Sequence, residues 1–282
     1  MNKLKSDLSI VLVSFKSKEK VTKIITKLKK NCKIIVVENS NDKSLEKKFY
    51  KSKNVCFYYP KLNKGFASGL NHGVNKAKTK FILYLDIDTK INSFQIKKLY
   101  SKAKNIINLG VVTAKIKDQN YNDLILGRDK ITKMNYVKFN TGCVMFFNRK
   151  TFLNLGGFDE NFFLYFEESD FYERCMYKNK KIFLFEDILV EHEGRGSIDS
   201  AYKKKYEVLR NWHYCWSKFN FYYKHKNYFV AFSKTFPNLV KSIKGIILSL
   251  LKLDVHGINL HFAETGGLIS AYLRFSSFYR IK

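Results

Sequence analysis

The sequence FILYLDIDT, residues 81–89, does more than any other stretch to decide the fold. Its unbroken apolar run is typical of a strand that is buried on both faces of a sheet. Asp86 and Asp88 follow at once, and two neighbouring carboxylates repel each other unless a cation or a proton intervenes. Hard divalent cations bind through one or two carboxylates together with phosphate oxygens. A metal site is one interpretation, and a solvated turn or a helix N-cap is the other.

Strand and helix patterns alternate on the N-terminal side of this stretch. The strand patterns cover residues 8–13, 33–37 and 54–59, and the helix patterns cover residues 18–30 and 67–77. This alternation is typical of βαβ units. We therefore expect an α/β fold with a Rossmann-like, mostly parallel central sheet and helices on both of its faces.

Polar side chains follow the predicted strands at one edge of the sheet. Ser14 follows the first strand, and Glu38 and Asn39 follow the second. Asp86 and Asp88 follow the strand at residues 81–85. Because ligands of such sheets collect at the carboxyl ends of the strands, we expect these side chains to converge on a ligand.

Residues 63–73, NKGFASGLNHG, combine regularly spaced glycines with the start of a predicted helix. Helix N-termini whose backbone amides approach a ligand closely suit phosphate or nucleotide binding. The segment has neither the GxGxxG pattern of a dinucleotide fold nor the lysine–hydroxyl pair of a P-loop. Glycine spacing alone is therefore weak support for a nucleotide site.

The pattern changes beyond the first half of the chain. Longer strands are predicted within residues 136–147, then a turn at Gly156 and Gly157, and then a helix at residues 168–177. After residue 197 the sequence becomes basic and aromatic and shows no strand alternation. We therefore expect a helical C-terminal region that packs on the main domain.

An acidic run follows aromatic residues in the stretch NFFLYFEESD, residues 161–170. Apolar surroundings raise the pKa of a carboxyl group, and such a group is a better base for a hydroxyl proton near neutral pH. The competing interpretation places Glu167, Glu168 and Asp170 in the first turn of a helix, where the helix dipole favours negative charge. We favour the catalytic interpretation for Glu168 and leave both open for the other two.

His192 stands in the stretch LVEHE, just past a predicted apolar strand. A lone histidine is more often an ordinary packed or exposed residue than a ligand. Imidazole nevertheless binds Mn²⁺-like ions frequently where carboxylates supply the remaining ligands. The residue is therefore a candidate metal ligand only in combination with the two aspartates.

The chain carries a large excess of positive charge. Its 282 residues include 52 Lys and Arg against 24 Asp and Glu, a net charge of +28, which favours contact with anionic surfaces. A general bias towards Lys, Asn, Ile, Phe and Tyr explains the excess equally well, so charge alone assigns no partner. Five scattered cysteines without a CxxC pair indicate reduced thiols and a cytoplasmic protein. We expect neither a signal peptide nor a spanning helix.

Six segments in order resemble the bacterial family-two glycosyltransferases, in particular their rhamnosyltransferase-like branch. They are SIVLVSF, IIVVENS, LNKGFASGLNHGV, FILYLDIDT, TGCVMFFNRKTFLNLGGFDENFFLYFEESDFYER and LVEHEGRGS, within about residues 8–197. The resemblance implies a GT-A fold that binds a UDP- or dTDP-linked sugar. It also implies an inverting hexosyl or rhamnosyl transfer to an acceptor hydroxyl in the synthesis of cell-surface polysaccharide or glycolipid.

The resemblance further implies a role for each candidate residue. The donor nucleotide sugar would contact Ser14, Glu38, Asn39, Asn63, Gly65, Asn71 and Asp86. A divalent cation, Mg²⁺ or Mn²⁺, would be held by Asp86, Asp88 and His192, and Glu168 would be the general base. The family usually has Asp at the position of Glu38, and many members have Asp at that of Glu168. These two departures support an alternative, a non-catalytic nucleotide-sugar-binding protein of the same fold.

We expect two domains from this resemblance. Residues 1–197 would form the catalytic domain, with a nucleotide-sugar half to about residue 115 and an acceptor half from residue 116. Residues 198–282 would form a basic, aromatic helical region. Its stretch 237–253 has one apolar side, made of Leu239, Ile243, Ile246, Ile247 and Leu250.

That apolar side fits either a core-facing helix or a membrane-attaching one. We expect peripheral contact with anionic membrane, because family members often act on lipid-linked saccharides at the inner face of the plasma membrane. Basic residues interleaved with aromatic ones, as in residues 202–228, also suit a membrane interface. No recognised nucleic-acid-binding module is visible, so we expect no nucleic acid partner.

Overall fold

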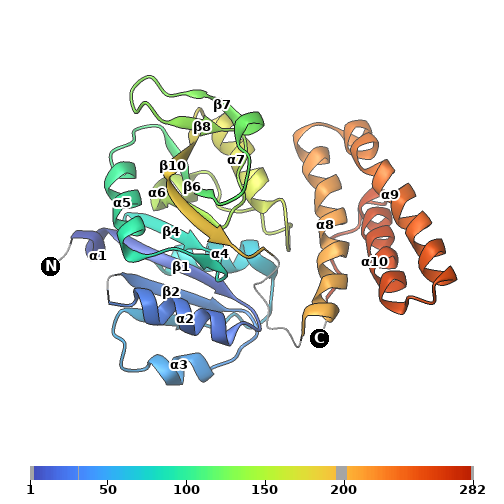
Figure 1. Ribbon diagram of the computed structural model, residues 1–282, viewed down its shortest axis with the longest axis horizontal. Coiled ribbons are helices and arrows are strands. Elements are labelled where there is room, and N and C mark those ends of the chain that lie inside the picture. The colour runs from blue at the N-terminus through green and yellow to red at the C-terminus, as the bar shows by residue number, and fades with distance from the viewer. Residues whose placement is uncertain (1–2, 31, 195–201, 281–282) are drawn as a thin grey trace. The chain divides into compact units, whose positions relative to one another are not determined.

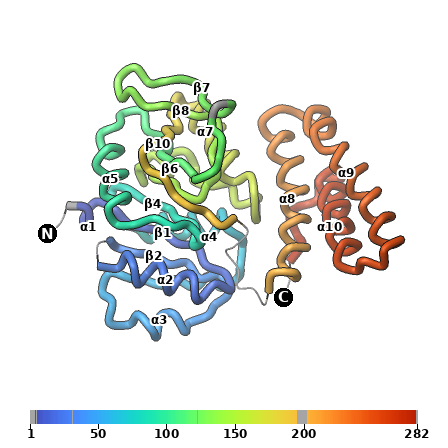
Figure 2. Tube along the Cα trace, viewed as in Figure 1, coloured from blue at the N-terminus to red at the C-terminus, as the bar shows by residue number. Residues whose placement is uncertain are grey.

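The computed structural model describes residues 3–30, 32–194 and 202–280 (Figures 1 and 2). The chain divides into two compact units. The first, the α/β unit, comprises Met1–Phe158 and Phe171–Asp199, and the second, the helical unit, comprises Asp159–Asp170 and Ser200–Lys282. The boundary expected at residues 197 and 198 lies outside the described residues. The short segment Asp159–Asp170 groups with the C-terminal helices.

A ten-stranded mixed sheet forms the centre of the α/β unit, in the order β3-β2-β1-β4-β9-β6-β10-β8-β7, with β5 paired to β10 (Figure 1). The strands are β1 (Leu8–Ser14), β2 (Lys33–Glu38), β3 (Val55–Tyr58), β4 (Phe81–Leu85), β5 (Thr89–Lys90), β6 (Leu109–Ile116), β7 (Ile125–Arg128), β8 (Asn135–Val137), β9 (Val144–Asn148) and β10 (Lys181–His192). The first four are parallel, and β9 runs antiparallel to both β4 and β6. The predicted α/β fold is confirmed.

Helices cover both faces of this sheet (Figure 1). The described helices of the unit are α1 (Lys3–Asp7), α2 (Lys18–Leu28), α3 (Ser44–Phe49), α4 (Gly65–Lys76), α5 (Ser93–Ala103), the 3₁₀ turn Asn122–Leu124, α6 (Arg149–Asn154) and α7 (Glu167–Tyr177), whose first turn belongs to the helical unit. Successive strand residues point to opposite faces, so Ile10 packs in the core layer of α2, α3 and α5 while Val11 packs in that of α4.

Two of the glycines in residues 63–73 are explained by packing. A Cβ atom on Gly69 would lie 2.8 Å from a Val13 methyl group, and one on Gly73 would lie 2.5 Å from a Val11 methyl group. Both valines belong to β1. The glycine spacing therefore allows α4 to lie directly against the central strand of the parallel half, and it places the start of α4 at the strand ends.

The length expected for the strands at residues 136–147 is wrong. The structure has two short strands there, β8 and β9, separated by residues 138–143. Asn140 is buried in this connection, and its amide donates to the Thr113 hydroxyl at 2.6 Å and to the Ala114 carbonyl at 3.2 Å. These side-chain bonds tie the connection to β6, so residues 138–143 form no ladder of their own.

Three long helices form the helical unit: α8 (Lys203–His225), α9 (Tyr228–Leu251) and α10 (Val255–Tyr272) (Figure 1). The helix expected at residues 237–253 begins much earlier, and Pro237 lies inside it. The rings of Trp212, Trp216 and Phe219 are buried in the core of this unit, so they do not serve a membrane surface as the sequence suggested. Within the described residues, no helix is both long and apolar enough to cross a membrane.

Candidate functional site

The turn after β4 is fixed to the start of β9. The backbone amide of Asp86 donates to the Cys143 carbonyl at 2.9 Å, and the Thr89 amide donates to the Asp86 carbonyl at 3.0 Å. The Thr89 hydroxyl donates to the same Cys143 carbonyl at 3.3 Å. The two aspartates are thereby held on a tight turn at the carboxyl edge of the parallel strands.

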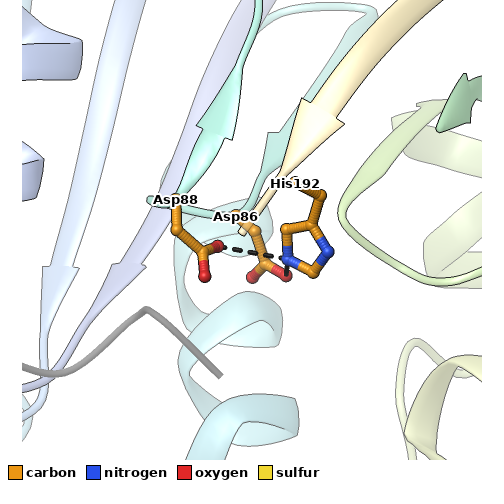
Figure 3. Close-up of side chains that lie close together, drawn as sticks. All are labelled: Asp86, Asp88 and His192. Atoms are coloured by element: carbon orange, nitrogen blue, oxygen red, sulfur yellow. Dashed lines mark ion pairs between the residues drawn. The ribbon is translucent and has the colours of Figure 1, made fainter. Parts of the chain in front are cut away.

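The pairing of β5 with β10 brings in a third side chain from far along the chain. Thr89 pairs with His192 in antiparallel register, which sets the imidazole beside the turn. Its Nε2 atom lies 3.3 Å from Asp86 Oδ2 and 3.2 Å from Asp88 Oδ1 (Figure 3). One ligand atom from each of the three residues lies within 4.8 Å of the others. The structure therefore brings together the three predicted metal ligands.

The electrostatics of this cluster match a site for a cation. Hydrogen bonds from His192 to Asp86 and Asp88 raise the pKa of the imidazole to about 10 despite its partial burial. Burial opposes ionisation of Asp88, but the hydrogen bond and charge of His192 outweigh it and lower the Asp88 pKa. The protonated imidazole thus sets a positive charge beside two carboxylates. A divalent cation bound there would replace that proton.

Three of the predicted nucleotide residues meet at the ends of β1 and β2. Ser14 and Glu38 are paired in register, and the Asn39 amide donates to the Ser14 carbonyl at 2.7 Å. Val11 of β1 pairs with Tyr84 of β4, so the end of β1 lies next to the turn after β4. Among the described residues, the buried Ser14 hydroxyl has no hydrogen-bond partner. An orphaned buried hydroxyl at this edge fits a polar ligand.

Glu38 also shapes the loop that follows it. Its carboxylate accepts from the Ser40 hydroxyl at 2.5 Å and from the Asp42 amide at 2.7 Å. Burial raises the Glu38 pKa, and the bonds from Ser40 and Asp42 oppose that rise. The longer side chain thus has a structural task in the loop, and its contact with a ribose stays a prediction.

The residues predicted from the glycine-spaced segment separate into two groups. Asn63 accepts from the Gly65 amide at 2.9 Å, and the Asn39 side chain donates to the Gly65 carbonyl at 3.2 Å. These contacts join the start of α4 to the β1–β2 edge. Asn71 instead exchanges two hydrogen bonds with the backbone of Phe158, both at 2.9 Å. Its observed contacts therefore fix the chain after Gly157, and a donor contact stays a prediction.

Glu168 lies in the first turn of α7, within the segment Asp159–Asp170 of the helical unit. The two residues before that turn, Tyr165 and Phe166, both have φ of 68°. Left-handed backbone is rare for bulky residues and occurs where surrounding contacts enforce it. Residues at functional sites are over-represented among such outliers.

Helix α8 supplies the contacts that hold this segment. The Ser217 hydroxyl donates to the Leu164 carbonyl at 2.8 Å. The Phe166 and Phe221 rings pack together with their centroids 5.4 Å apart. Lys224 Nζ lies 2.7 Å from Asp170 Oδ1, and Asp170 is fully buried. Asp170 of the acidic run therefore has a structural role, and sequence reasoning had no signal for its partners on α8.

Sequence reasoning also missed Tyr84. Its side chain is buried under the metal cluster, and its hydroxyl donates to Asp86 Oδ1. The alternation of side chains along β4 sets Tyr84 and Asp86 on the same side. The sequence shows that Tyr84 and Asp86 are two residues apart. Because Tyr84 stands in an apolar run, we did not expect its hydroxyl to bond to Asp86.

The comparisons with known proteins agree with this geometry. A family model described as Glycosyl transferase family 2 matches residues 9–183, and the chain belongs to that family. Its class is thus that of the glycosyltransferases. Over 266 residues it is 22% identical to the low-salt glycan biosynthesis hexosyltransferase Agl10 of Haloferax volcanii, an alignment that covers 87% of this chain and 81% of that protein.

Solved structures of similar fold include two glycosyltransferase complexes. The mannosyltransferase PcManGT of Pyrobaculum calidifontis, in complex with GDP-Man and Mn²⁺, has a TM-score of 0.60 at 12% identity over 95% of this chain and 87% of its own. S. aureus TarS 1–349 in complex with UDP has a TM-score of 0.55 at 13% identity over 94% and 90%. The chain spans only 39% of a longer TarS chain. These likenesses confirm the GT-A fold, and the rhamnosyltransferase-like branch stays a prediction.

Proposed function

We propose that this protein transfers a sugar from a UDP- or dTDP-linked donor to an acceptor hydroxyl with inversion at the anomeric carbon. The observation that carries the proposal is the cluster of Asp86, Asp88 and His192 beside the orphaned hydroxyl of Ser14. A cation site and a nucleotide-sized set of polar groups at one sheet edge are what a nucleoside-diphosphate sugar requires. Membership of glycosyl transferase family 2 supports the same reaction class.

The donor set fits Mg²⁺ or Mn²⁺. Two carboxylates and one imidazole suit Mn²⁺, and both ions bind readily where a diphosphate supplies further oxygens. Such an ion, when bound, neutralises the charge that develops on the departing diphosphate. The residues that would hold this ion are Asp86 and Asp88, through their carboxylates, and His192, through Nε2.

Glu168 is the base in this proposal. Its carboxylate accepts the proton of the acceptor hydroxyl while that oxygen attacks the anomeric carbon and the bond to the diphosphate breaks. Attack opposite the leaving group inverts the centre, and no covalent intermediate forms. The left-handed turn at Tyr165 and Phe166 and its contacts with α8 support a role that needs a fixed position.

The transferred sugar in this proposal is a hexose or rhamnose. The names of similar proteins support a hexose, since Agl10 is named a hexosyltransferase and PcManGT was solved with GDP-Man. Rhamnose rests on the sequence resemblance alone. We further propose that the acceptor belongs to a cell-surface polysaccharide or glycolipid under synthesis on the cytoplasmic side of the membrane.

Calorimetric titration with UDP, dTDP and GDP tests the donor site. We expect UDP or dTDP to bind in the presence of Mn²⁺ and to lose affinity with EDTA or in Asp88→Ala, whereas binding of GDP alone would contradict the proposed donor nucleotide. Asp187→Ala is the matched control, because Asp187 is an exposed acid of β10 that pairs only with lysines among its described contacts. No binding by any nucleotide in any condition would sink the donor-site assignment.

Turnover distinguishes the enzyme from the alternative, a binding protein that lost catalysis. With the preferred nucleotide known, its hexose and rhamnose conjugates are screened for slow hydrolysis and for transfer to saccharide acceptors. We expect Glu168→Gln to lower turnover by about 100-fold or more while donor affinity is kept. Glu173→Gln, on the same helix, is the control. Metal-dependent binding with no turnover of any donor would favour the non-catalytic alternative.

A further inference from the structure

Helix α9 is built with its apolar side chains facing outward. Its buried residues are small or polar: Ala231, Thr235, Ser242 and Ser249. Its large apolar side chains are exposed on the opposite side, and they form what we name the α9 apolar face: Phe229, Phe236, Val240, Ile243, Ile247, Leu250 and Leu251. A helix on the surface of a water-soluble domain has the reverse arrangement.

The contacts between α9 and α10 resemble those of helices packed in lipid. The hydroxyls of Ser242 and Thr265 are 2.9 Å apart, and those of Thr235 and Tyr272 are 3.1 Å apart. A Cβ atom on Gly245 would lie 2.5 Å from the His261 ring, so the glycine allows close approach. Small residues and hydroxyl pairs hold helices together where apolar surface is needed on the outside.

The connection between the two helices continues the apolar surface. Leu251, Leu253 and Val255 are 78%, 86% and 70% exposed. Exposed apolar side chains also occur on α10 at Phe262 and Ile269. So many large exposed apolar side chains on two neighbouring helices and their connection mark a surface that a membrane or another molecule covers.

The charges beside the α9 apolar face indicate which kind of partner covers it. Helix α9 contains Lys234, Lys241 and Lys244 and no acidic residue, and the connection adds Lys252 and Asp254, which caps α10. The helical spacing sets these lysines on one flank of the apolar face. With a net charge of +28 on the chain, a second copy would meet repulsion at this flank, whereas anionic lipid head groups would be attracted to it.

We propose that the α9–α10 pair binds the surface of an anionic lipid bilayer, with the α9 apolar face and the Leu251–Val255 connection in the acyl boundary. The lysines then lie at head-group depth. No described helix is suited to cross a bilayer, so the pair lies in the interface. This inference stands apart from catalysis, because it uses no residue of the α/β unit.

Vesicle sedimentation with the full chain tests the proposal. We expect the protein to sediment with vesicles of equimolar phosphatidylcholine and phosphatidylglycerol, to bind pure phosphatidylcholine less, and to be released in part by high salt. Leu250→Ser, Leu251→Ser and Leu253→Ser combined should weaken binding by about tenfold or more. These side chains are exposed, so the variant should keep its thermal midpoint.

The control replaces equally exposed apolar residues elsewhere. Phe94→Ser, Ile107→Ser and Ile131→Ser combined lie in the α/β unit and should leave vesicle binding unchanged. Sedimentation velocity without lipid measures the competing outcome. If the wild type is a dimer that the leucine variant dissociates, and neither binds vesicles, the face joins two copies and the proposal fails. Equal vesicle binding by the wild type and the leucine variant would also overturn it.

Discussion

Removal of the Tyr84 hydroxyl should be felt at the cluster of Asp86, Asp88 and His192. The hydroxyl donates to Asp86 Oδ1, so it orients one predicted metal ligand. Tyr84→Phe keeps the buried ring and should weaken Mn²⁺ binding in the presence of nucleotide by about tenfold, as loss of a ligand's hydrogen-bond partner generally does. Tyr100→Phe, which removes a similar bond to Asp7, is the control for calorimetry.

His213 should make the helical unit sensitive to acid. Its Nε2–H donates to the Tyr279 carbonyl at 2.9 Å, and Nδ1 accepts from the Ser277 hydroxyl at 3.1 Å. Burial lowers the His213 pKa to about 3, against 6.5 for an ordinary histidine. Above pH 6.5 both the folded and the unfolded state are neutral at this residue. Below it only the unfolded state takes up the proton, so stability falls as the pH drops towards 3.

The loss attributable to His213 between about pH 7.5 and about pH 5 should reach about 2 kcal/mol. Urea unfolding of the wild type and His213→Gln at both pH values measures it, and the variant should show the smaller pH dependence. His192 acts in the opposite sense, since its pKa is raised to about 10, but it is present in both proteins. Identical pH dependence in the two proteins would contradict the prediction.

At the scale of elements, the approach of α10 to α8 depends on one of two neighbouring glycines. A Cβ atom on Gly267 would lie 2.3 Å from the Trp212 carbonyl oxygen, which is backbone and cannot turn aside. A Cβ atom on Gly266 would meet the Trp212 ring at an ordinary 3.6 Å. Gly267→Ala should therefore reduce the free energy of unfolding by about 1–3 kcal/mol.

Gly266→Ala is the internal comparison for that loss. Alanine is the better helix former by about 1 kcal/mol, so this substitution should be neutral or stabilising. Chemical denaturation of the two variants measures the difference directly. If both alanines were tolerated equally, the helices would not be in contact at Gly267.

Elements with a local signature were predicted well, and elements defined by distant partners were not. Strand β4 was predicted with the bounds the structure has, because an unbroken apolar run reports burial directly. The region 136–147 has apolar residues at both ends, but Asn140 bonds to β6 and divides it. In α9 the apolar side was visible, but its outward orientation depends on how α8 and α10 pack against the other side.

At the scale of the whole molecule, the sequence predicts the position of one part of the candidate site and fails to predict that of the other. Ser14, Glu38 and the two aspartates follow strands, so sheet topology alone brings them to one edge. The segment Asp159–Asp170 precedes the second half of α7 in the chain, yet it is held by helix α8. No local sequence pattern predicts that Asp159–Asp170 groups with the C-terminal helices, because the contacts join residues that lie far apart in the chain.

The division predicts that donor binding and turnover are separable by truncation. A chain ending at residue 199 keeps every predicted metal ligand and nucleotide contact, all of which belong to the α/β unit. It loses α8, and with it the bond from Ser217 to Leu164 and the ion pair of Lys224 with buried Asp170. The segment that carries Glu168 should then lose its fixed position.

We therefore expect the truncated chain to bind the nucleotide with Mn²⁺ at near wild-type affinity and to lose about 100-fold or more in turnover. Full-length Glu168→Gln should give the same pair of results, which is the comparison that assigns the loss to the base segment. Calorimetry and donor hydrolysis measure the two quantities on each protein. A truncated chain that still turned over donor at the wild-type rate would show that turnover does not need the contacts with α8. Full-length Glu168→Gln with wild-type turnover would show that the role proposed for Glu168 is wrong.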